Sequence, residues 1–67
     1  MKIKLNNNEE IFEASEMTIS QLLEEKKYTF KMLVIKINGE IVKKDLYPVT
    51  KVKEGDDVIV LHLMSGG

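Results

Sequence analysis

The fold of this chain depends on an apolar stretch near its end, Val58-Ile59-Val60-Leu61-His62-Leu63-Met64, which is followed by Ser65-Gly66-Gly67. Successive side chains of a strand point to opposite faces of a sheet, so a stretch that is apolar on both faces predicts a central strand. We place Val58 and Val60 towards the core, which leaves the alternate residues of the stretch on the other face.

Length and composition exclude several classes of protein. A chain of 67 residues predicts one domain, residues 1–67, with a small core. It has 43% hydrophobic and 31% charged residues, and no apolar stretch approaches the roughly 18 residues that span a membrane. The absence of cysteine excludes disulfides and thiolate zinc sites, and the small size without disulfides favours a cytoplasmic protein. A net charge of −1, with lysine and no arginine, argues against nucleic-acid binding.

The first part of the chain predicts a hairpin. Lys2-Ile3-Lys4-Leu5 alternates polar and apolar residues, and Asn6-Asn7-Asn8 supplies side chains that tolerate turn conformations. We expect the second strand from about Glu10 to Ala14, with Phe12 towards the core because it has the larger apolar area.

A helix follows the hairpin. Thr18 and Gln21 have the spacing of a capping box, and the helix is expected to run to about Lys26 or Lys27. Its apolar face would consist of Ile19, Leu22 and Leu23.

Asn38-Gly39 is the strongest hairpin signal in the sequence, and it lies between the predicted strands 33–37 and 40–42. A type I′ turn there requires positive φ at both residues. Ile35 and Ile37 should face the core. Because Tyr47-Pro48 disfavours regular structure, we expect residues 43–53 to form a loop with a short turn.

The face of the last strand that points away from the core predicts an exposed apolar patch. Its residues from the last strand are Ile59, Leu61 and Leu63, and their expected neighbours on other strands are Lys4, Val34 and Lys36. An apolar patch with a lysine rim, leading into the last glycines, is typical of a docking surface. Two alternatives stay open, namely cover by the 43–53 connector and self-association in a dimer.

Residues 65–67 are expected to form a flexible tail. Glycine lacks a Cβ, so Gly66-Gly67 can pass through a slot that is too narrow for side chains, as entry into the active site of another protein would require. A frayed end without a role is the alternative.

No catalytic residue and no metal site are predicted. His62 is the only histidine and lies within a strand. The carboxylate pairs are adjacent in sequence, so their side chains point apart and cannot act as a paired acid and base.

Several short motifs, in this order and spacing, resemble one known family. They are Met1 to Asn6, Leu22-Leu23-Glu24, Ile37-Asn38-Gly39-Glu40-Ile41-Val42, Glu54-Gly55-Asp56 and Gly66-Gly67. Over essentially all 67 residues the chain resembles the ubiquitin-like β-grasp sulfur carriers, above all the ThiS family of thiamin biosynthesis, to which MoaD is related. The resemblance implies an α+β, ubiquitin-like β-grasp fold with a mixed five-stranded sheet packed on one main helix.

The resemblance also implies a function. The Gly67 carboxylate would be adenylated by an E1-like, ThiF-type enzyme that uses ATP, and would then become a thiocarboxylate with sulfur from a sulfur-donating enzyme. The carrier would pass this sulfur to a ThiG-type thiazole synthase, as a protein substrate that binds no cofactor itself. Ser65 and Gly66 would form the tail with Gly67. The residues expected to contact partners are Ile59, Leu61, Leu63, Met64, Lys4 and Lys36.

Two alternative functions remain at this point. The carrier could serve molybdopterin or another sulfur-transfer pathway. The chain could also be a ubiquitin-like protein modifier, or a binding module that uses only its sheet face.

Overall fold

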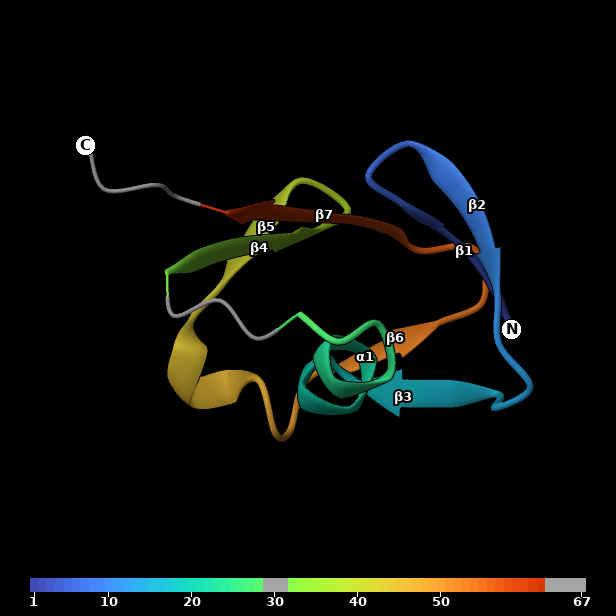
Figure 1. The fold of residues 1–67 in the computed structure, drawn as a ribbon, viewed down its shortest axis with the longest axis horizontal. Coiled ribbons are helices and arrows are strands. Elements are labelled where there is room, and N and C mark those ends of the chain that lie inside the picture. The colour runs from blue at the N-terminus through green and yellow to red at the C-terminus, as the bar shows by residue number, and fades with distance from the viewer. Residues whose placement is uncertain (29–31, 63–67) are drawn as a thin grey trace.

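The computed structural model describes residues 1–28 and 32–62, which form a twisted sheet above one helix (Figure 1). In chain order the elements are β1 (Lys2–Leu5), β2 (Asn8–Ile11), β3 (Glu16–Thr18), α1 (Ile19–Glu25), β4 (Leu33–Ile37), β5 (Glu40–Val42), the 3-10 helix η1 (Lys44–Leu46), β6 (Lys51–Lys53) and β7 (Asp57–His62). This is the predicted α+β arrangement, with five strands in the main sheet and one main helix.

The last strand lies at the centre of the main sheet, as its apolar pattern predicts. The strand order is β2-β1-β7-β4-β5. Strand β7 pairs in parallel with β1 and antiparallel with β4, so the sheet is mixed. The first and last strands of the chain are therefore neighbours.

Two asparagine-containing turns set the register of the two hairpins. Asn38 and Gly39 have φ values of 51° and 87°, which confirms the predicted type I′ turn. Asn6 and Asn7 also have positive φ, 52° and 68°. These two residues complete the first turn, so Asn8 already pairs with Leu5.

Strand β2 consequently covers residues 8–11, whereas the expected strand covered residues 10–14. Phe12 follows the strand and packs partly buried against the core, which confirms its expected side.

The helix begins as predicted and ends slightly early. The Thr18 hydroxyl accepts a hydrogen bond from the Gln21 amide at 3.1 Å, and the Gln21 side chain accepts one from the Thr18 amide at 2.9 Å. This capping box satisfies two amides that have no partner within the helix. Helix α1 ends at Glu25, one or two residues before the expected end, and Lys27 has a φ of 58°. A left-handed residue just beyond the last turn is a common helix ending.

The connector 43–53 has the expected short turn, as η1, but the prediction that the rest is a loop was wrong, because residues 51–53 form a strand. It contains η1 and strand β6, and β6 pairs antiparallel with β3 in a separate two-stranded sheet. Val52 is fully buried and lies opposite Met17. Strands of three residues are shorter than the alternating patterns that identify strands from sequence.

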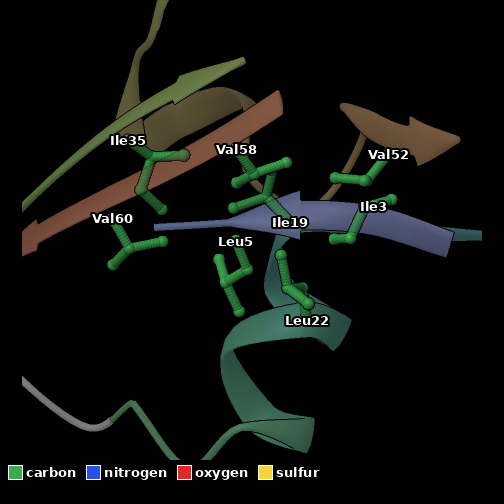
Figure 2. Packing of buried hydrophobic residues seen from close by; sticks show 8 residues of the cluster. All are labelled: Ile3, Leu5, Ile19, Leu22, Ile35, Val52, Val58 and Val60. Atoms are coloured by element: carbon green, nitrogen blue, oxygen red, sulfur yellow. The ribbon is translucent and has the colours of Figure 1, made fainter. Parts of the chain in front are cut away.

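The core lies between the main sheet, α1 and β6 (Figure 2). Its buried side chains are Ile3, Leu5, Ile19, Leu22, Ile35, Val52, Val58 and Val60. This confirms the core positions predicted for Ile19, Leu22, Ile35, Val58 and Val60. Ile37 and Leu23 are partly buried and pack against the same cluster.

Side-chain hydrogen bonds from two asparagines hold β7 in place. The Asn6 Oδ1 accepts a hydrogen bond from the Val60 amide at 2.8 Å, and the Asn38 Oδ1 accepts one from the Asp57 amide at 2.9 Å. Asn38 also donates through Nδ2 to Asp56. Turn residues of both hairpins thus fix the position of β7 along its neighbours.

Truncation of the core face of β7 should destabilise the protein more than truncation of its other face. Val60 is 7% exposed, so Val60→Ala should lower the free energy of unfolding by about 1 to 3 kcal/mol through lost burial and a residual cavity. Leu61→Ala is the matched control, because Leu61 is 46% exposed, and it should cost less than about 1 kcal/mol. Urea denaturation measures both values. An equal loss in the two variants would contradict the assigned faces.

The ion pair between β3 and β6 should be visible in the titration of Glu16. Lys51 Nζ lies 2.8 Å from Glu16 Oε1 and holds the pKa of this carboxyl below its usual value, with a smaller contribution from Lys53. Because the folded pKa is depressed, the pair stabilises the fold above the unfolded pKa, and this contribution is lost as the pH falls through the folded pKa.

NMR titration of the Glu16 carboxyl tests this assignment. Lys51→Met should raise the pKa of Glu16 towards its ordinary value, and Lys53→Met should change it less. A larger shift in the Lys53 variant would refute the assignment to Lys51.

Candidate docking face

Alternation along β7 divides its side chains between the core and the opposite side of the sheet. Val58 and Val60 point towards the core, Ile59 is partly buried, and Leu61 is 46% exposed. This is the predicted division of the strand. The sheet face opposite α1 therefore presents apolar side chains from the central strand.

Neighbouring strands extend this face. Val34 of β4 lies opposite Leu61, and Lys36 lies opposite Ile59. Ile41 of β5 lies on the other side of Lys36. We call these five residues, Val34, Lys36, Ile41, Ile59 and Leu61, the outer face. Lys36 lies between two isoleucines of the outer face and not at its rim, where the sequence pattern predicts lysine.

Lys4 occupies a different part of the sheet. It is exposed between the buried Ile3 and Leu5 of β1, and it lies opposite Asp57 at the start of β7. Leu61 is four residues further along β7, about 13 Å away at a strand rise of roughly 3.3 Å per residue. Lys4 therefore shares the side of the sheet with the outer face but does not adjoin Leu61.

Ile41 is a candidate docking residue that sequence reasoning missed. It is 66% exposed, and its neighbour Val42 lies opposite the buried Ile35. Both are aliphatic, so composition does not show which of them faces outward. The two-residue turn Asn38-Gly39 could have identified it, because that turn places Ile41 opposite Lys36.

The remaining predicted site residues lie outside the described residues. They are Leu63, Met64, Ser65, Gly66 and Gly67. In sequence they follow His62, the last residue of β7, which pairs with Leu33. The outer face is thus built partly on β7, which is separated from Gly66-Gly67 by three residues in the sequence.

Neither a metal-binding group nor a membrane-spanning helix is found among the described residues. In residues 1–28 and 32–62, no group of three or more His, Asp or Glu side chains is arranged to hold a metal ion. Over the same residues, no helix is long and apolar enough to cross a membrane. The outer face can bind a partner through apolar contacts and through the positive charge of Lys36.

Comparisons with known proteins agree with this arrangement. The model of the ThiS family matches residues 2–67. The crystal structure of a thiamine biosynthesis protein (ThiS) from Geobacter metallireducens is similar with a TM-score of 0.90 and 28% identity over 100% of both chains. An NMR solution structure of a thiamine biosynthesis protein from Geobacter metallireducens gives a TM-score of 0.80 and 28% identity over 100% of this chain and 88% of the other.

No curated protein sequence matches the chain. The family match nevertheless spans nearly all of it, and the similar ThiS structure has the same β-grasp fold. The chain belongs to the ThiS family.

Proposed function

We propose that this protein is a sulfur carrier of thiamin biosynthesis whose sulfur travels on the Gly67 carboxyl group. The observation that carries the proposal is the extent of the family match, which runs to residue 67 and so includes Gly66-Gly67. Likeness to a ThiS structure over the whole chain supports the same pathway. The protein is then a substrate of other enzymes, acts in the cytoplasm and binds no cofactor of its own.

The proposed chemistry takes place in two steps at one carboxyl group. A ThiF-type enzyme adenylates Gly67, as a carboxylate oxygen bonds to the α-phosphorus of ATP and pyrophosphate leaves. Sulfide-level sulfur, released by a sulfur-donating enzyme, then attacks the Gly67 carbonyl carbon, the carbon–oxygen bond to AMP breaks, AMP leaves, and Gly67 carries a thiocarboxylate. A ThiG-type thiazole synthase receives this sulfur. The activating enzyme supplies the groups that stabilise the developing charge.

Reach explains why Gly67 is the carboxylate that reacts. Carboxylates at neutral pH are nearly all ionised, so ionisation does not distinguish Gly67 from the Asp and Glu side chains. A segment from Met64 to Gly67 spans up to roughly 13 Å at about 3.3 Å per residue, so it can enter a cleft while the folded domain stays outside. Gly66 and Gly67 carry no side chain that would block a narrow entry. In this proposal the single domain spans residues 1–67, with 65–67 as its tail.

The outer face supplies the contact that holds the carrier on its partners. Ile59 and Leu61 are its central residues, Lys36 and Lys4 add positive charge for acidic groups on the partners, and we propose further contacts from Leu63 and Met64, which come next in sequence. Exposed aliphatic side chains beside a lysine suit an interface with an apolar centre. The same contact would place the tail at the partner's active site.

Loss of the last residue should prevent activation of the protein without affecting its folding. Deletion of Gly67 should leave the melting temperature nearly unchanged, because a terminal residue makes few contacts, but it should abolish thiocarboxylate formation. Intact mass spectrometry after incubation with ATP, the cognate activating enzyme and a sulfur source measures the exchange of one oxygen atom for sulfur.

Two controls accompany the deletion. The full-length chain should gain the mass difference, and Val60→Ala should gain it at temperatures where it remains folded. A full-length chain that never gains sulfur, while the enzyme modifies a known carrier, would exclude the proposed function.

A charge introduced into the outer face should impair docking without unfolding the protein. Leu61→Asp should lower kcat/KM for adenylation at least about tenfold, mainly through a higher KM, because it places an unpaired carboxylate in an apolar contact. Ile11→Asp is the matched control, since Ile11 is an exposed aliphatic residue of β2 outside the outer face. Pyrophosphate release measures kcat/KM for both variants. An equal loss of kcat/KM in the two would contradict the assignment of docking to the outer face.

A further inference from the structure

The two edges of the main sheet differ in a way that the proposed function does not require. Strands β2 and β5 form the edges, and each carries one highly exposed isoleucine, Ile11 at 77% and Ile41 at 66%. An open edge presents backbone N–H and C=O groups that can pair with another strand. The two edges differ in how readily they could accept such an added strand.

Hairpin register shows which backbone groups face outward. Ile37 and Glu40 flank the two-residue turn and form the hydrogen-bonded pair that closes it, so the next pair, Lys36 and Ile41, is not hydrogen-bonded. The N–H and C=O of Ile41 therefore point away from β4. In the described part of the chain neither group makes another hydrogen bond. The same reasoning, from the closing pair Leu5 and Asn8, places the N–H and C=O of Ile11 outward at the other edge.

The charges at the two edges differ. Strand β2 carries Glu9 and Glu10, which form ion pairs with Lys2 at 3.2 Å and with Lys26 at 3.0 Å. Glutamates on an edge repel an approaching acidic strand. Strand β5 carries Glu40, and around it lie Lys36, Lys43, Lys44 and Asp45, so lysines outnumber carboxylates there by three to two. In residues 1–28 and 32–62 none of these three lysines forms an ion pair.

Space for an added strand lies next to β5. A hollow of about 320 Å³ lies between β5 and the start of β6, with Glu40, Ile41 and Val42 on one side and Thr50 and Lys51 on the other. A paired strand would lie about 4.8 Å from β5. It would also continue the outer face, because Ile41 lies opposite Lys36, which in turn lies opposite Ile59.

We propose that β5 accepts an extended, acidic segment of a partner protein as a sixth strand of the main sheet. Hydrogen bonds to the N–H and C=O of Ile41 would supply the pairing, as in other complexes where a peptide extends a sheet. Apolar side chains of the segment would cover Ile41. Its carboxylates would lie near Lys43 and Lys44, so the basic lysines favour this segment over a neutral or basic one.

The test uses a defined probe, a blocked heptapeptide of alternating valine and glutamate, titrated into the full-length ¹⁵N-labelled protein. The amide signal of Ile41 should shift, and its hydrogen exchange should slow at least about tenfold on saturation. A peptide with lysine in place of glutamate should bind at least about tenfold more weakly, and added salt should reduce the difference.

Matched proline variants locate the contact. Ile41→Pro removes an N–H that makes no ladder hydrogen bond and should abolish binding. Ile11→Pro makes the same change at the acidic edge and should leave binding unchanged. The double variant K43E/K44E keeps the backbone of β5 intact and should weaken binding of the acidic peptide at least about tenfold, so the proposal stays testable if a proline variant fails to fold.

Three outcomes would overturn the proposal. The first is no shift of Ile41 at roughly millimolar peptide, a concentration at which even weak complexes form. The second is binding at Ile11, or binding that persists in Ile41→Pro. The third is concentration-dependent sedimentation that either proline variant abolishes, which would show that the acidic β2 edge of a second copy occupies β5. None of these measurements depends on activation of Gly67, so the proposed function stands or falls separately.

Discussion

The position of β7 is the constraint on which the rest of the structure depends. Strand β7 pairs with β1 on one side and β4 on the other, so it joins the two hairpins into one sheet. A slip of one residue would exchange its faces and bring Ile59 and Leu61 into the core in place of Val58 and Val60. Hydrogen bonds to Asn6 and Asn38 oppose that slip, because they come from turn residues that each hairpin already fixes. The β-grasp core is therefore specified by short-range turns that act on a strand distant in sequence.

The same constraint determines what the protein can present to a partner. Val58 and Val60 fix β7 in the core, so Ile59 and Leu61 must face outward, beside Lys36 on β4. The strand that carries these outward residues also leads directly to the last glycines. In the proposed carrier cycle, a partner that binds the outer face thus holds the chain a few residues from the reactive carboxyl group of Gly67. In this proposal one strand therefore sets both the binding surface and the starting point of the tail.

Local signals predicted well and long-range pairings did not. Asn38-Gly39 and the Thr18–Gln21 capping box act within a few residues, and the structure has both. Strands β3 and β6 were missed because each has three residues and depends on a partner far along the chain, through Val52 against Met17 and Lys51 against Glu16. Ile41 was missed for a different reason, since only register separates it from Val42. The outward position of Ile59 and Leu61 followed from simple alternation, whereas Lys36 between two isoleucines required the strand order.

In the proposed cycle a small carrier serves several enzymes, so its surface must distinguish one partner from another. Each partner that acts on Gly67 in that cycle would reach the same tail and approach over the outer face, whose apolar residues would do little to distinguish the partners. Discrimination is a difference between affinities, and it is easier to build on groups that only one partner contacts. Strand β5 offers such groups, because the outward N–H and C=O of Ile41 and the nearby Lys43 and Lys44 lie at the margin of the outer face and do not belong to β7. The acidic β2 edge, with its glutamates in ion pairs, disfavours an acidic strand there. A partner that adds an acidic strand to β5 therefore gains affinity without changing where the tail begins, and specificity can vary independently of the chemistry at Gly67.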